Sequence, residues 1–250
     1  MRISSDRICL PIALFVFAAS ANAEDDSWWV TAPWYGSVST GFLIVSEEAR
    51  FFGPTQSVYG GSPGIDIDDG VVYSIEIGRE LPGNWRIGME LRHSILEPES
   101  GNVLGTDQRS EDVFRLDGEI DSTALLFKLG YEFNNLTWWA TPYVEGGLGV
   151  SRNTVSTPLS VEYNSAIWNG TSFEGQVLND YSFPEDTATQ FAAAVAAGLK
   201  LQFSSQFSLQ LEYGFSFLND AGTDFDEEGD AIGISDITTQ QLSFGIEYRF

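Results

Sequence analysis

Side chains alternate in character over the last nine residues of the chain, which read Leu-Ser-Phe-Gly-Ile-Glu-Tyr-Arg-Phe from Leu242 to Phe250. Successive side chains of a β-strand point to opposite faces, so one face here carries only large apolar and aromatic groups. The other face carries Ser243, Gly245, Glu247 and Arg249. In a soluble sandwich the apolar face points to a protein core. In a membrane barrel it points to lipid, and the small and charged face lines the lumen.

The start of the chain has the features of an export leader. Two arginines precede an apolar run at 8–19, and an Ala-x-Ala site ends at Ala23. This pattern predicts a secretory signal peptide at 1–23 that is cleaved after Ala23. The apolar run is too short to span a bilayer as a helix. The single cysteine, Cys9, would leave with the leader, so the exported chain is expected to fold without disulfides.

The composition is strongly acidic, with 12 Lys+Arg, 36 Asp+Glu and a formal net charge of −24. Loss of Arg2, Asp6 and Arg7 with the leader lowers Lys+Arg from 12 to 10 and Asp+Glu from 36 to 35, which gives −25. Because polyphosphate binding needs a basic surface, no nucleic-acid partner is expected. After the leader, no stretch reaches the ~18 to 20 continuous apolar residues of a transmembrane helix. Any membrane span must therefore be built from strands.

The two-faced pattern of the last strand recurs along the chain. Each segment has roughly 10 residues or more, which is the length needed to cross a bilayer at a tilt. The alanine-rich middle of one segment, 189–203, also fits a helix, and the sequence leaves this alternative open. The predicted strands are 34–45, 71–81, 85–95, 122–133, 142–150, 189–203, 207–218 and 236–250.

The connections between these segments alternate between long and short. Pro82-Gly83-Asn84 is a tight turn signal, and the other short connections are at 134–141 and 204–206. A soluble sandwich has no reason to sort its loops in this way, whereas a transmembrane barrel has short turns at one end and long loops at the other. The predicted fold class is therefore all-β, an eight-stranded antiparallel up-and-down transmembrane β-barrel over 34–250. The long loops are at 46–70, 97–121, 152–188 and 219–236.

The chain resembles the small eight-stranded outer-membrane barrels of the opacity-protein and porin-like family. The resemblance covers 24–250 and rests on the leader, the Pro-Tyr-Val-x-Gly-Gly-Leu-Gly-Val strand at 142–150, the glycine-containing sixth strand and the terminal Tyr-Arg-Phe. Tyr248 and Phe250 resemble the C-terminal insertion signal of such barrels. The resemblance implies outer-membrane lipid and the barrel-assembly machinery as partners, a bacterial outer-membrane location, and a short periplasmic tail at 24–33. Because such families include adhesins, structural proteins and minor channels, it leaves the function open.

Charged residues on the inward face are predicted to form a salt-bridge network in the lumen. Buried charges persist only when they are paired, and an eight-stranded barrel is just wide enough for side chains to fill it. Lys200 and Glu145 are expected to approach one another. The sequence therefore favours a largely plugged lumen, with an ion path through a charged filter as the alternative. The predicted network is Glu76, Arg86, Glu90, Arg92, Lys128, Glu132, Glu145, Lys200, Glu212, Glu247 and Arg249.

The long loops carry most of the remaining acidic residues. The spacing of Asp224, Asp226, Glu228 and Asp230 resembles the start of an EF-hand loop. The twelfth position, where a bidentate Glu belongs, is Ser235. The expectation is therefore loose binding of divalent cations at the loops, and no specific metal site.

Enzymatic chemistry finds little support in the sequence. His93 is the only histidine, so a metallohydrolase with the usual histidine ligands is excluded. Asp121 and Ser122 are the nearest residues that would support His93 in catalysis. We therefore expect no catalytic residues, no cofactor and a non-catalytic barrel that is structural or adhesive through four long acidic surface loops. A minor solute or ion channel is the alternative, and a lipid-modifying enzyme is the third possibility.

Overall fold

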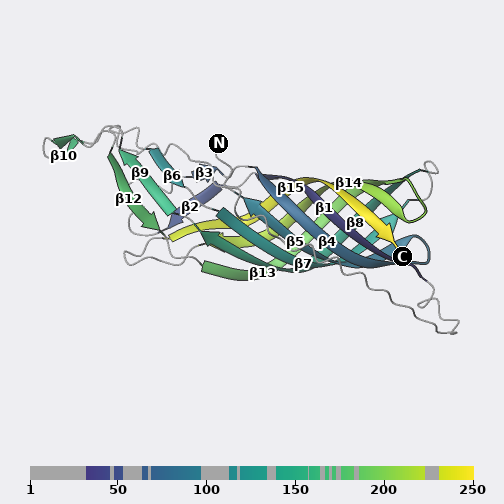
Figure 1. Cartoon of the computed structure of the whole chain (residues 1–250). Coiled ribbons are helices and arrows are strands. Elements are labelled where there is room, and N and C mark those ends of the chain that lie inside the picture. Colours follow the sequence, from purple (N-terminus) through teal and green to yellow (C-terminus); the bar gives the residue numbers. More distant parts are fainter. Residues whose placement is uncertain are drawn as a thin grey trace. The chain divides into compact units, whose positions relative to one another are not determined.

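Eight long antiparallel strands close into one sheet in the computed structural model of the chain (Figure 1). The closing pair is β1 with β15, which are in register from Tyr35↔Arg249 to Val45↔Thr239. Each long strand has a neighbour on both sides, as a structure that crosses a bilayer requires. The eight strands are β1 (Trp34–Val45), β4 (Gly70–Leu81), β5 (Trp85–Leu96), β7 (Glu119–Glu132), β8 (Ala140–Ser156), β13 (Asp186–Gln202), β14 (Phe207–Gly222) and β15 (Ala231–Arg249).

The structure describes residues 32–45, 48–52, 64–66, 69–96, 113–116, 119–133, 139–156, 158–163, 167–168, 171–172, 176–182, 186–222 and 231–250. Side chains are placed in 32–45, 69–96, 119–133, 139–155, 187–218 and 237–250. The predicted signal peptide, most of the predicted tail at 24–33 and the acidic residues Asp224, Asp226, Glu228 and Asp230 lie outside the described residues. Among the described residues, no helix is long and apolar enough to cross a membrane.

The register gives the barrel a shear of ten residues. A row of directly opposed residues that starts at Trp85 on β5 returns to the same strand at Ile95, a shift of 95 − 85 = 10 residues. Closing eight strands with this stagger requires them to tilt by about 40° from the barrel axis. The row passes through Tyr131, Val144, Ala197, Tyr213, Leu242, Phe42 and Val71.

The predicted fold class is confirmed, and each predicted segment coincides with one long strand. β13 pairs with β8 and with β14, so the helical alternative for 189–203 is wrong. Five strands, β7, β8, β13, β14 and β15, extend at least three residues further toward the long loops than predicted, and β4 and β5 extend by one residue each. The two ends of the barrel are named here by their connections: the turn end holds 82–84 and 203–206, and the loop end holds the long connections.

Short strands occupy parts of the long connections, which the sequence predicts as loops. β2 (Glu48–Phe52) pairs with the loop-side part of β15, and β3 (Gly64–Asp66) pairs with β2. These two strands therefore extend the barrel sheet past the loop-side end of β1. A separate three-stranded sheet joins two different connections, because a strand before β7 pairs with one that follows β8. Its strands are β6 (Val113–Leu116), β9 (Pro158–Tyr163) and β12 (Gln176–Ser182), and β10 (Ile167–Trp168) pairs with β11 (Thr171–Ser172).

At the turn end, the β4–β5 turn has the backbone that its sequence demands. Gly83 has a φ of 77° and Asn84 has a φ of 66°. These two residues follow Pro82 in a three-residue turn between the paired residues Leu81 and Trp85, and glycine and asparagine are the residues that adopt positive φ most readily.

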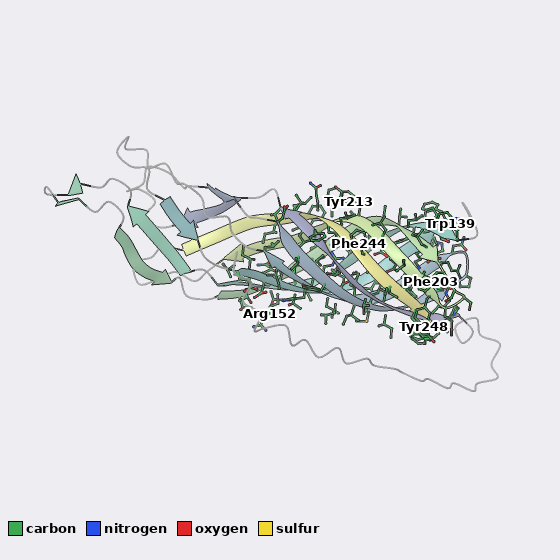
Figure 2. The ribbon with its side chains drawn as sticks, turned by 45° about the horizontal axis from the view of Figure 1, so that its top comes forward. Trp139, Arg152, Phe203, Tyr213, Phe244 and Tyr248 are labelled. Carbon is green, nitrogen blue, oxygen red and sulfur yellow. The ribbon has the colours of Figure 1, made fainter. Side chains whose placement is uncertain are left out.

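The outer wall of the barrel is apolar, and large side chains such as Phe127, Leu148 and Phe244 are exposed on it. Aromatic residues collect at the turn end, where the rings of Phe207 and Tyr248 lie 4.8 Å apart. Figure 2 shows Trp139, Phe203 and Tyr248 at this same end. An apolar band bordered by an aromatic girdle is the surface that a barrel presents to lipid.

Candidate functional site: the barrel interior

The interior of the barrel begins, at the turn end, with a cluster of ion pairs. Arg249 Nη2 lies 2.5 Å from Glu80 Oε1. Lys200 Nζ lies 2.9 Å from Glu247 Oε2 and also contacts Glu132. Lys200 and Glu247 are almost completely buried, so each charge depends on its partner.

Arg86 forms the next layer with two tyrosines. Its guanidinium lies 3.9 Å from the centre of the Tyr35 ring and 5.9 Å from that of Tyr143. It also lies 3.0 Å from Glu247 and 3.4 Å from Glu76. Its 2 % exposure makes Arg86 one of the largest fully buried side chains in the described barrel. A cation that is stacked on aromatic rings and paired with carboxylates is held in one place by several interactions at once.

Glycines on neighbouring strands make room for both tyrosine rings. A Cβ at Gly78 would clash with the Tyr35 hydroxyl, and a Cβ at Gly198 would lie 2.5 Å from Tyr143 Cζ. The Tyr35 hydroxyl donates to Glu76 Oε1 at 2.5 Å. The small residues that the strand pattern places on the inner face are therefore the space into which the aromatic layer fits.

Lys128 lies at the centre of the next layer, among three carboxylates. Its ammonium is 2.9 Å from Glu76 Oε2 and 2.7 Å from Glu90 Oε2, and it contacts Glu145 Oε1. Oxygens of these three glutamates lie within 4.8 Å of one another, a spacing that suits a metal ion. The lysine ammonium occupies the position that such a cation would take, so the chain itself already supplies a cation to the cluster.

Two further charged residues lie beside Lys128. Arg92 Nε is 2.6 Å from Glu90 Oε1, and an Arg92 terminal nitrogen donates to Ser216. Glu212 accepts hydrogen bonds from the Tyr143 hydroxyl at 3.0 Å and from Gln241 at 3.1 Å. Hydrogen bonds from neutral donors therefore satisfy one of the inward carboxylates.

Toward the loop end, the inner face changes from charged to neutral polar and then to apolar. Ser122 donates to Asn153 at 2.7 Å, and the Asn153 amide donates to the Leu218 carbonyl at 2.9 Å. The apolar side chains beyond them are buried within the barrel, so they close the loop end of the lumen without charges. They are Leu43, Val72, Leu96, Ile120, Val155, Leu218 and Ile237.

Two small polar cavities lie along the interior. One, of about 20 Å³, is lined by Lys128, its three glutamates and Tyr143. The other, of about 30 Å³, is lined by Glu132, Lys200, Glu247 and the turn at 204–206. Since a water molecule needs roughly 10–15 Å³ of such space, each cavity has room for a few waters at most.

The structure places all eleven residues of the predicted network on the inner face and joins most of them in one chain of contacts. The predicted approach of Lys200 to Glu145 is wrong, because Lys200 is opposite Thr141 while Glu145 is opposite Ala196. Glu145 pairs instead with Lys128. Sequence reasoning missed Glu80, although it is two positions beyond an inward glycine. It also missed the role of Tyr35 and Tyr143, since nothing in the strand pattern marks an aromatic residue as part of a charge network.

His93 lies on the outer wall near the loop end. Its Nδ1 is 3.0 Å from Thr123 Oγ1, and its Nε2 is 3.7 Å from Asp121 Oδ1. The sequence singled out Asp121 and Ser122 as possible support, but Ser122 points into the barrel and bonds Asn153. Thr123 takes its place beside the imidazole.

The outer membrane protein beta-barrel domain family matches residues 8–250. The chain belongs to this family. The protein is therefore an outer-membrane β-barrel, and the resemblance to small eight-stranded outer-membrane barrels is confirmed. No curated protein matches the chain.

Solved structures with a similar fold come from several bacteria. Neisserial surface protein A is 13% identical, with a TM-score of 0.44 and coverage of 87% of this chain and 97% of that one. OprG of Pseudomonas aeruginosa is 11% identical, with a TM-score of 0.48 and coverage of 86% and 95%. The outer membrane protease OmpT of Escherichia coli is 11% identical, with a TM-score of 0.47 and coverage of 87% and 97%. Likeness at this level does not assign an activity.

Proposed function

We propose that this protein is a non-catalytic outer-membrane barrel whose lumen is closed to solutes. In this role it is structural or adhesive and presents four long acidic loops at the cell surface. The observation that carries the proposal is the layer of Arg86, Tyr35 and Tyr143, which lies between the two polar cavities. A hydrated ion would have to displace a buried guanidinium from two aromatic rings and three carboxylates, Glu76, Glu132 and Glu247, to pass.

The apolar inner face at the loop end supports the same proposal. Residues such as Leu96, Ile120 and Ile237 are at most 1% exposed, and their side chains offer an ion no polar partner. Narrow apolar constrictions block ions because the ion must shed its water. The two barriers differ in chemistry, so a single local rearrangement would not remove both.

Planar-bilayer recording from refolded residues 24–250 tests the proposal. The unmutated barrel should give no large, steady single-channel currents. A double variant, Tyr35→Ala with Tyr143→Ala, separates the two barriers, because it removes both rings but leaves the apolar loop end in place, and it should also give no large, steady currents. Large, steady currents in the unmutated protein would overturn the closed-lumen proposal.

A minor channel is the second candidate, favoured by the two polar cavities and by an excess of carboxylates over cations on the inner face. Glu80 adds a seventh inward carboxylate to the predicted six, against five cations. A channel lined in this way should prefer cations. In the same recordings, a channel should change its ion selectivity on Lys128→Met, whereas a closed barrel should show no current in either form.

A lipid-modifying enzyme is the third candidate, since the His93 ring lies between Thr123 and Asp121 at the lipid-facing wall. Such chemistry requires a nucleophile beside a base and an orienting acid. We expect the unmutated barrel to hydrolyse micellar esters no faster than the His93→Ala variant does. Ester hydrolysis that depends on His93 would favour the enzyme.

A further inference from the structure

Arg152 is a cation on the lipid-facing wall of β8. It is exposed, and its strand neighbour on the same face is Thr123 of β7. Among the residues whose side chains are placed, no carboxylate forms an ion pair with it. Figure 2 shows Arg152 at the end of the barrel opposite Trp139, Phe203 and Tyr248. An unpaired guanidinium on a lipid-facing wall needs an anionic partner or water.

The position of Arg152 along the barrel places it at a membrane boundary. Arg152 follows Trp139 by 152 − 139 = 13 residues along one strand. At about 3.3 Å per residue and a tilt of about 40°, this corresponds to about 30 Å along the barrel axis. The apolar part of a bilayer has about this thickness. Because Trp139 belongs to the aromatic end, Arg152 lies at the level of the headgroups of the other leaflet.

The neighbouring residues mark the same boundary. One step toward the turn end, the outward positions are Leu125, Val150 and Phe191, all exposed and apolar. At the level of Arg152, the outward positions on the adjacent strands are Thr123 and Thr189. The wall therefore changes from apolar to polar within one pair of residues.

We propose that Arg152 and Thr123, with His93 beside them, bind the phosphate of an anionic lipid headgroup. Guanidinium offers up to five N–H donors in a planar fork that matches a phosphate, and a threonine hydroxyl adds another donor. His93 is directly opposite Thr123 and completes a polar row across three strands. Asp121 Oδ1 lies 3.7 Å from His93 Nε2, so one carboxylate borders this polar row on the side of the imidazole.

Arg79 is the other cation on the described outer wall, and its guanidinium already has partners within the protein. Its guanidinium lies 5.3 Å from the centre of the Trp34 ring, and its Nε donates to the Ala32 carbonyl at 3.2 Å. It lies at the turn end, where β4 finishes. Arg79 therefore provides a matched control, because its removal deletes the same charge from the same wall at the opposite boundary.

The test compares lipid retention by the refolded full-length mature barrel. The protein is reconstituted in vesicles of equal parts phosphatidylcholine and phosphatidylglycerol, extracted into mild detergent, and assayed for bound phosphatidylglycerol by native mass spectrometry. A chelator is present throughout, so that divalent cations cannot bridge lipid to the acidic loops. Inorganic phosphate is added in a parallel arm to distinguish a lipid headgroup from a free phosphate.

Arg152→Gln should retain phosphatidylglycerol roughly fivefold more weakly, as expected for the loss of one basic residue at an anionic surface. Arg79→Gln should retain it as the unmutated barrel does, and inorganic phosphate should not displace it. Arg152→Lys keeps the positive charge but loses the planar guanidinium, so it should retain an intermediate amount of phosphatidylglycerol. This variant also tests the proposal if Arg152→Gln misfolds. Equal retention by Arg152→Gln and the unmutated barrel, an equal loss in Arg79→Gln, or displacement by inorganic phosphate would overturn the proposal.

Discussion

The inner wall of the barrel shows how single side chains settle what the lumen contains. Lys128 forms ion pairs with Glu76, Glu90 and Glu145 at once, and Arg86 is shared between carboxylates and a tyrosine ring. Each of these two buried cations is thus held by more than one partner. Removal of a shared cation leaves several charges without compensation, whereas removal of one carboxylate leaves the cation with others. Cations and anions of this network are therefore expected to respond differently to mutation.

Lys128→Met should lower the free energy of unfolding by about 3–5 kcal/mol, because three buried carboxylates lose their common cation. Addition of Glu145→Gln should restore part of the loss, since one of the three charges is then removed. Urea unfolding of the barrel in vesicles measures both effects. Arg79→Met on the outer wall is the control, with an expected change within about 0.5 kcal/mol. The network has little energetic role if Lys128→Met costs no more than this control.

Gly198→Ala should destabilise the barrel by about 1–3 kcal/mol, because the added Cβ would lie 2.5 Å from Tyr143 Cζ and force the ring to move. The same change in a Tyr143→Ser background should cost much less, since the ring is gone. Gly146→Ala is the matched control on the lipid-facing side of β8, where the nearest atom to a new Cβ is 3.7 Å away. Unfolding free energies of the unmutated barrel, the single variants Gly198→Ala and Tyr143→Ser and their combination form a double-mutant cycle, and additive costs would refute direct steric coupling.

At the scale of strands, the sequence predicts position well and register poorly. Two-faced alternation locates all eight strands, because lipid on one side and a lumen on the other impose it. It does not locate their loop-side ends, where strands such as β8 and β15 continue beyond the apolar band. The alternation also contains no information on the register between neighbouring strands. Equal distances from the turns would place Lys200 beside Glu145, whereas β8 and β13 pair Lys200 with Thr141. Alternation places Leu43 and Leu126 on the inward face of their strands, but it does not show that buried apolar residues together fill one end of the lumen.

Strand β15 closes the sheet, and its last residue contributes directly. Phe250 N donates to Trp34 O at 2.9 Å, Trp34 N donates to Phe250 O at 3.1 Å, and the Phe250 ring stacks on Tyr248 at 5.9 Å. We expect deletion of Phe250 to reduce the amount of assembled barrel in cells severely. We expect it to lower the unfolding free energy of barrel refolded in detergent by only about 1–3 kcal/mol, since few contacts are lost.

Heat-modifiable mobility on gels reports assembly in cells, and urea unfolding reports stability in detergent. Phe133→Ala is a suitable control, because Phe133 is an exposed aromatic residue at the same end that is not at the chain terminus. Normal assembly after the deletion, or equal losses in both assays, would argue against an insertion signal at Tyr248 and Phe250.

For the complete barrel, the sorted connections predict its direction in the membrane. Both ends of the described barrel, Trp34 and Phe250, lie at the turn end, where they hydrogen-bond to one another. Short turns face the periplasm and long loops face the cell exterior in barrels of this kind. One protease recognition sequence inserted at 223–230, and the same sequence inserted at 134–138 in a second variant, should therefore behave oppositely. Protease added to intact cells should cut only the first variant, and permeabilised cells should allow both cuts.

Because the inserted sequence is identical, a difference in cleavage between the two sites reports how accessible each site is to the protease, not how well its sequence is cleaved. Cleavage at 134–138 in intact cells would reverse the assignment, and it would also move Arg152 from the outer leaflet to the inner one.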